Sequence, residues 1–214
     1  ASADARVTIV QALGEARSRE AARRILPFAE SPDQKLRQAA LAALANIGDA
    51  SAGPVLSRVR VAASAIERAK APALYLLYAR RRAEAGGTSE ALRIAREILR
   101  DYSSPGESHI ASNALSLIVA ILQEKALPDL LAAADSKDSA FRAAALELAQ
   151  SMPGTAITAR WAEKAAIASA ETRADIIAML GRRKDLSADE AFVVLRGVYF
   201  ARSRSTGTPM LWRT

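Results

Sequence analysis

The sequence predicts an all-α fold in which about six helix pairs stack into an α-solenoid, with an enlarged pair near the middle. Two observations lead to this prediction: an arginine recurs at a 31-residue spacing, and the positions at fixed distances from it are helix caps or apolar residues. Arg6, Arg37 and Arg68 are 31 residues apart. Ala111 takes the next position after a longer step of 43 residues, and Arg142 and Arg173 then continue the 31-residue spacing. A period of this length is typical of proteins built from one helix pair per repeat.

Residues that favour helix starts lie four positions before the arginine column. They are Ser2, Asp33, Ser64, Glu107, Asp138 and Ser169. Five of the six have short oxygen-bearing side chains, which accept hydrogen bonds from the first backbone N–H groups of a helix. The positions three and seven residues after the column are apolar in every repeat and share one helix face. These columns predict the second helix of each pair.

A column of bulky apolar residues predicts the first helix of each pair. It lies twelve residues before the arginine column and consists of Ile25, Leu56, Leu99, Leu130, Trp161 and Phe192. Pro54 and Pro128 precede two of these anchors by two residues, where a first-turn proline loses no helical hydrogen bond. We expect each anchor to insert between neighbouring pairs.

Together the columns predict twelve helices. The second helices span 2–14, 33–47, 65–85, 107–124, 138–151 and 171–183, and the first helices span 18–29, 51–63, 89–102, 127–135, 156–168 and 188–198. Helix pairs of this size cannot bury their apolar faces alone, so we expect them to stack on one another.

Three segments resemble the HEAT-repeat family: Asp33–Asp49, with the sequence DQKLRQAALAALANIGD, Asp138–Leu146, and Arg173–Gly181. The resemblance covers about residues 2–198 and implies one solenoid domain over 1–198, in which the second helices line the concave face. It does not indicate an activity, because such repeats serve very different proteins.

The longer step between repeats enlarges one helix pair, at about residues 65–102. About twelve extra residues extend the second helix past Tyr75 and Tyr78 to the terminator Gly86-Gly87. A longer pair that packs on itself is the simpler interpretation. Alternatively, a protruding aromatic and basic hairpin docks a partner.

Both ends of the array are irregular. The chain opens with a second helix that has no first helix before it, and residues 199–214 form a tail with no helical period. We expect either that the array continues in a larger protein, which we favour, or that the tail folds back over the open end with Leu211 and Trp212.

We expect the arginine column, which is Arg6, Arg37, Arg68, Arg142 and Arg173, to form a structural ladder. A cation in the first turn of a helix opposes the helix dipole and therefore needs an acceptor nearby. In HEAT-like arrays, as the resemblance implies, such arginines pair with acidic or carbonyl groups near the turns. Asp33 and Asp138 are local candidates.

Charge supplies the candidate binding site. The chain has 30 Lys and Arg against 23 Asp and Glu, a formal net charge of +7. Its strongest candidate for a partner-binding patch combines Arg80, Arg81 and Arg82 with Arg93, Arg96 and Arg100, all in the enlarged pair. Nucleic acid is one candidate partner for such a patch. Two columns expected on the concave face contain no cation, which argues against a groove that follows phosphates. They are Val7, Gln38, Ala69, Ser112, Ala143 and Ala174, and Gln11, Ala42, Ala73, Ser116, Glu147 and Ala178.

Composition argues against catalysis and resident metals. The chain has no Cys and a single His, His109, so it offers no thiol nucleophile, disulfide or multi-His zinc site. A HEAT-like DNA glycosylase resembles the chain in architecture only. Such an enzyme needs an aromatic cleft and a carboxylate to receive an extruded base, and the chain contains no motif that matches them. No apolar run reaches the roughly 20 residues that span a bilayer. We therefore predict a non-enzymatic scaffold with no cofactor, an unknown protein partner and an unassigned compartment, with nucleic-acid binding as the alternative.

Overall fold

The computed structural model describes residues 3–62, 65–102, 104 and 106–183, without the side chains of 61–69. Every regular element in this part of the chain is helical, so the predicted all-α class is confirmed. The predicted helix at 188–198, its anchor Phe192 and the tail 199–214 lie outside the described residues.

Contacts divide the chain into two compact units, one ending at Ser103 and the other beginning at Ser104. The first contains α1 (Ala3–Glu15), α2 (Arg19–Ile25), η1 (Leu26–Glu30), α3 (Gln34–Ile47), η2 (Ala50–Ala52), α4 (Gly53–Ala62), α5 (Ala65–Glu84) and α6 (Thr88–Asp101). The second contains α7 (Ser108–Leu122), η3 (Gln123–Ala126), α8 (Leu127–Ala133), α9 (Ser139–Gln150), α10 (Thr155–Ile167) and α11 (Ala170–Gly181). These bounds agree with the predicted helices to within a few residues.

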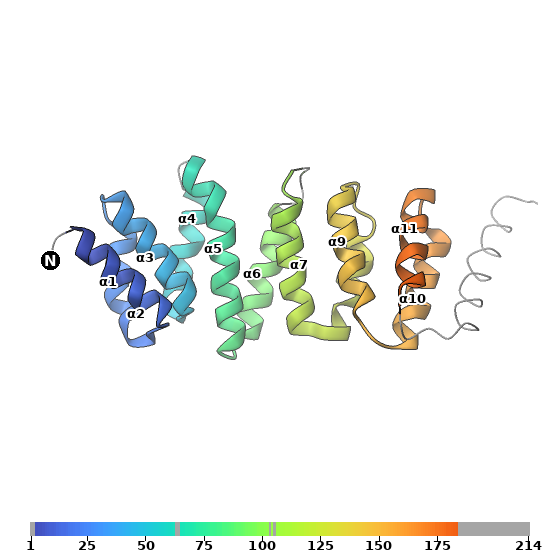
Figure 1. Ribbon diagram of the computed structural model, residues 1–214, viewed down its shortest axis with the longest axis horizontal. Helices are drawn as coiled ribbons and strands as arrows, with labels where there is room; N and C mark the ends of the chain where they lie inside the picture. Colours follow the sequence, from blue (N-terminus) through green and yellow to red (C-terminus); the bar gives the residue numbers. More distant parts are fainter. Residues whose placement is uncertain (1–2, 63–64, 103, 105, 184–214) are drawn as a thin grey trace, which may run out of the picture. The chain divides into compact units, whose positions relative to one another are not determined.

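Within each unit the helices form two layers (Figure 1). In the first unit, α1, α3 and α5 lie side by side in one layer, and α2, α4 and α6 form the other. In the second unit, α7, α9 and α11 form one layer, with α8 and α10 behind. Within each unit, the second helices of the predicted pairs therefore share one layer.

Two aspartates cap their helices by the same geometry. The Asp33 carboxylate accepts hydrogen bonds from the backbone N–H groups of Lys35, at 2.9 Å, and Leu36, at 3.3 Å. The Asp138 carboxylate accepts the equivalent pair from Ala140 and Phe141, at 2.9 and 3.0 Å. Such caps satisfy backbone donors that have no partner inside the helix. They explain why α3 and α9 begin where the sequence predicts.

The predicted anchors form the core, with one exception. Ile25, Leu56, Leu130 and Trp161 are all at least 97% buried. Leu99 is only half-buried, and Ile98 fills the buried position instead. The prediction for this anchor was wrong by one residue, because α6 packs against the lengthened α5, where the spacing taken from the other repeats does not hold.

The extra residues of the enlarged pair pack internally. Tyr75 and Tyr78 are fully buried on α5, and their parallel rings lie 6.2 Å apart between centroids. The Tyr78 hydroxyl donates to Glu90 on α6 at 2.9 Å. Aromatic rings of this size contribute much of the stability of a small core. The extension is thus a longer helix pair packed on itself, and its tyrosines are not exposed to a partner.

Candidate functional site

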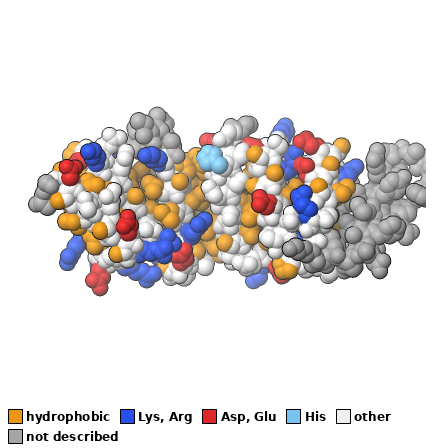
Figure 2. Space-filling model, in the orientation of Figure 1, with side chains coloured by type: hydrophobic (Ala, Val, Ile, Leu, Met, Phe, Trp, Pro, Cys, Tyr) orange, Lys and Arg blue, Asp and Glu red, His pale blue; other side chains and the backbone are white. Residues whose placement is uncertain are grey.

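The layer of second helices in the first unit contains a groove of about 700 Å³. Helix α3 contacts both α1 and α5, so its residues occupy the middle of this groove. The lining consists of Val7, Gln11, Lys35, Gln38, Ala39, Leu41, Ala42, Val59, Lys70, Ala71, Ala73 and Leu74. Figure 2 shows hydrophobic side chains gathered over this part of the layer.

Helical periodicity explains why these side chains face the groove. Lys35, Gln38 and Ala42 are spaced by three and four residues, so they share one face of α3. Most other residues of α3 are buried against neighbouring helices, among them Leu36, Ala40 and Leu44. The face that remains outside the core is the one that lines the groove.

Small side chains shape the floor of the groove. Ala42 and Ala73 are exposed, and Ala39 and Ala71 lie at its buried base. Alanine leaves room for another backbone to approach closely, while Val59 and Leu74 supply larger apolar surface. An apolar concavity of this volume with a few polar groups is typical of a binding site.

Lysine is the only charged residue type among the described residues of the groove lining. Lys35 and Lys70 are both exposed, and no described carboxylate lies within ion-pairing distance of either ammonium group. Sequence reasoning identified the neutral positions of the groove but missed these two cations. The signal was present, because Lys35 precedes Gln38 by three residues and therefore lies on the same helix face.

The predicted arginine patch has a different character, beginning with Arg81. Its Nε and Nη2 atoms donate to Asn46 on α3 at 3.0 and 2.9 Å, and Asn46 donates to the Gly14 carbonyl on α1 at 3.0 Å. Gly48 caps the C-terminus of α3 with a φ of +69°, and a Cβ there would collide with Arg81. Arg81 therefore connects three second helices of the first unit.

Arg82 belongs to a second internal network. Its Nε donates to Glu90 at 2.8 Å, and Glu90 also accepts the hydroxyl of Tyr78. Burial, together with the bond to Glu90, raises the pKa of the Tyr78 phenol well above its usual value. Arg80, by contrast, is exposed. Sequence reasoning had grouped all three arginines because their neighbours on α6 and α3 are not visible in the local pattern.

The arginines of α6 are exposed but carry internal partners. Arg93 donates to Glu97 at 3.2 Å and Arg100 donates to Asp101 at 3.4 Å. Arg96 is exposed and also has an interaction within the protein. A hydrogen bond to Tyr75 raises the pKa of Arg93. Because α5 and α6 are antiparallel, this contact places Arg93 beside Tyr75, whereas Arg80 lies five residues further along α5 toward the turn that joins the two helices. The arginines are thus distributed along the hairpin.

The arginine column makes repeated contacts at the turns. Arg37 donates to the Ser31 carbonyl at 2.5 Å, and Arg142 donates to the Ser136 carbonyl at 3.0 Å, in each case six residues earlier. Arg173 donates to two carbonyls of the preceding helix end, at 2.9 Å each. Arg6 is exposed on α1, and the side chain of Arg68 lies outside the described part of the chain.

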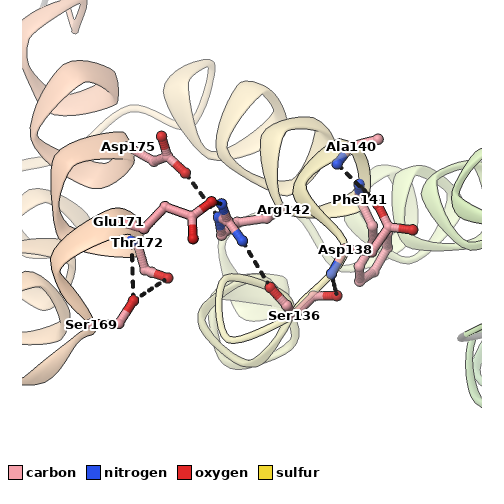
Figure 3. Close-up of polar contacts among 9 residues, drawn as sticks. All are labelled: Ser136, Asp138, Ala140, Phe141, Arg142, Ser169, Glu171, Thr172 and Asp175. Atoms are coloured by element: carbon pink, nitrogen blue, oxygen red, sulfur yellow. Dashed lines mark hydrogen bonds and ion pairs between the residues drawn. The ribbon is translucent and has the colours of Figure 1, made fainter. Parts of the chain in front are cut away.

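Arg142 is the most buried member of the column, with 4% of its surface exposed (Figure 3). Its guanidinium also donates to Asp175 at 2.8 Å and to Glu171, both on α11. The bond to Asp175 is the main cause of the raised pKa of Arg142. Arg142 thus connects the turn before α9 to the neighbouring repeat.

The described residues contain no cluster of three or more carboxylate or imidazole groups that could bind a metal ion. His109 is exposed near the start of α7. Among the described helices, none combines the length and hydrophobicity needed to cross a bilayer.

Residues 1–77 match the family described as HEAT repeats. This match assigns the segment 1–77 to the HEAT repeats. All groove-lining residues fall inside the matched segment, so the groove is a feature of the HEAT repeats themselves. No curated protein is significantly similar to the chain. HEAT repeats generally mediate protein interaction or scaffolding, and proteins of this family are typically not enzymes.

Proposed function

We propose that this chain is a non-enzymatic protein-interaction module that holds a segment of a partner protein in the groove formed by α1, α3 and α5. The observation that carries the proposal is the groove itself, which is mostly apolar, about 700 Å³ in volume and lined by the second helices α1, α3 and α5 together with Val59 of α4. The mechanism is presentation of a rigid helical surface, with no chemical step.

The interior of the first unit supports this role. Arg81 and Asn46 connect the helices that form the groove, and Arg82, Glu90 and Tyr78 fix α5 against α6. A preorganised surface loses little conformational entropy when a partner binds, which improves affinity without adding contacts.

Recognition of nucleic acid by the arginines of the enlarged pair is the alternative. The exposed side chains of Arg80, Arg93 and Arg100 favour it. The carboxylates that accept from Arg82, Arg93 and Arg100 offset much of this positive charge, and a phosphate backbone would have to displace them. We therefore place protein binding first.

Filling the groove tests the proposed function. Random peptides displayed on phage are selected on the wild-type chain and then measured against Ala42→Trp, in which the indole occupies the groove. The matched control is Ala143→Trp, which changes an exposed alanine on the equivalent helix α9, outside the groove. Circular dichroism verifies that both variants remain folded.

We expect most selected peptides to bind Ala42→Trp at least about tenfold more weakly than the wild type and to bind Ala143→Trp normally. Peptides that bind all three proteins equally, or a selection that yields no specific peptide, would overturn the proposal.

A further inference from the structure

We propose that the occupant of the groove is an acidic amphipathic α-helix of a partner protein, with its apolar face on the alanines and its carboxylates on Lys35 and Lys70. This inference rests on the proposed function and adds the chemistry of the partner. The three properties that carry it are the helical walls of the groove, its apolar floor and its two lysines.

The walls of the groove favour a helical occupant. The lining residues belong to helices, so their backbone N–H and C=O groups are occupied within those helices. An extended peptide laid on this surface would bury its own backbone groups with only Gln11 and Gln38 as neutral hydrogen-bonding partners. A helix satisfies its backbone internally, which avoids that cost. Binding of a helix in a groove uses apolar side chains at positions i, i+3, i+4 and i+7.

The charge of the lining favours an acidic occupant. Lys35 lies in the first turn of α3, and Lys70 lies in the first half of α5. These helices run parallel because one helix, α4, separates them along the chain, so both lysines lie toward the same end of the groove. Among the lining residues that the structure describes, none carries a carboxylate.

Three carboxylates on α6 are already paired with arginines. Glu97 and Asp101 both accept from Arg60, and Glu90 accepts from Arg82. Lys35 and Lys70 give the groove a local positive charge, which attracts an acidic partner and fixes its orientation.

Other occupants fit this chemistry less well. Residues 199–214 of the chain carry Arg202, Arg204 and Arg213 and no acidic residue, so this tail would place cations beside Lys35 and Lys70. Nucleic acid would pair with the lysines but would bury its charged backbone against the apolar floor. A helix with carboxylates along one edge satisfies both parts of the groove.

The dimensions suit a helix of about three turns. Adjacent packed helices lie about 8–10 Å apart, so the distance from α1 across α3 to α5 is about 16–20 Å. A helix of about 11–13 residues covers this distance at 1.5 Å per residue.

A helix library separates this inference from the proposed function. Displayed 16-residue peptides carry apolar residues at i, i+3, i+4 and i+7 and a random choice of Glu, Gln or Lys at the flanking positions. The library is selected on the wild type, on the double variant Lys35→Glu/Lys70→Glu and on Ala42→Trp. Lys137→Glu is the matched control, because Lys137 is exposed and lies just before α9, outside the groove.

We expect selection on the wild type and on Lys137→Glu to enrich Glu over Lys at the flanking positions. Selection on Lys35→Glu/Lys70→Glu should reverse the preference. Individual acidic peptides should bind this double variant about tenfold more weakly than the wild type, because the two substitutions turn two exposed ion pairs into repulsions. Peptides should not be enriched on Ala42→Trp.

The other outcomes overturn the inference in distinguishable ways. Enrichment that Ala42→Trp abolishes but that shows no preference for Glu would refute the acidic helix and leave groove binding intact. Enrichment that Ala42→Trp does not affect would refute both. A wild-type dimer in sedimentation that Ala42→Trp dissolves would identify a second copy as the occupant, and displacement of bound acidic peptide by a short DNA strand at physiological salt would favour nucleic acid.

Discussion

Replacing Arg142 by Met is the sharpest test of how the second unit is held together. The side chain is 5% exposed and donates to three acceptors: the Ser136 carbonyl at 3.0 Å, Asp175 at 2.8 Å, and Glu171. Methionine keeps the apolar stem in place and removes only the guanidinium. The substitution therefore isolates the hydrogen bonds from the packing.

The magnitude follows from the exposure of the partners. The side chains of Glu171 and Asp175 are 73% and 44% exposed, so both carboxylates regain water when the guanidinium is removed. Solvent screening limits each of these pairs to about 0.5–1 kcal/mol. The hydrogen bond to the Ser136 carbonyl adds about 1 kcal/mol. We expect Arg142→Met to lower the free energy of unfolding by about 2–3 kcal/mol.

Fluorescence of Trp161 provides the assay. This side chain is fully buried on α10, and Trp212 is the only other tryptophan, so a Trp212→Phe background makes the signal specific to the second unit. Urea unfolding then compares Arg142→Met with Arg160→Met, which removes an exposed pair with Glu163. The control should change stability by less than about 0.5 kcal/mol. A loss for Arg142→Met as small as the control would refute the reasoning.

The remaining predictions concern the core, the arginines, acid stability and nucleic acid. Leu130→Ala should cost about 2–5 kcal/mol in urea unfolding, because the side chain is fully buried, and a loss under about 0.5 kcal/mol would contradict the assigned register. Arg80→Ser should leave the melting temperature nearly unchanged, whereas Arg82→Ser should lower it, because only Arg82 pairs with Glu90; equal effects would contradict these contacts. The bond to Arg60 lowers the pKa of Asp101, so the Arg60–Asp101 pair stabilises the fold fully above the unfolded pKa of about 3.9, and this stabilisation is lost as pH falls through the lower folded pKa. Asp101→Asn should therefore destabilise the protein at pH 7 but be nearly neutral at about pH 2. A difference in stability that does not depend on pH would argue against the pair. Short DNA and RNA should bind weakly at physiological salt in anisotropy titrations, whereas tight binding with a steep salt dependence would favour the alternative function.

Much of the fold could be predicted from the sequence because the signals that set it are local. Helix caps such as Asp33 and Asp138 act within three residues, and apolar spacing fixes which helix face is buried. The exception at Leu99 arose where extra residues break the period. Beyond that point, the side chain that fills the core depends on how α6 packs against α5.

The candidate site was harder to predict because it depends on which residues meet across helices. The sequence placed Gln38, Ala42 and Ala73 on one surface but left Lys35 and Lys70 out of it. It also treated Arg81 and Arg82 as available cations. Their partners are Asn46 and Glu90, and the position of Asn46, 35 residues away on another helix, is set by packing between repeats.

Methyl NMR of the chain bound to its tightest display peptide tests the central claim most directly. With ¹³C-labelled alanine methyl groups, the account predicts that resonances of Ala42 and Ala73 shift and show contacts to the peptide, while that of Ala143 on the equivalent helix of the second unit does not. Shifts that spare Ala42 and Ala73 and appear elsewhere on the protein would contradict the assignment of the groove as the binding site.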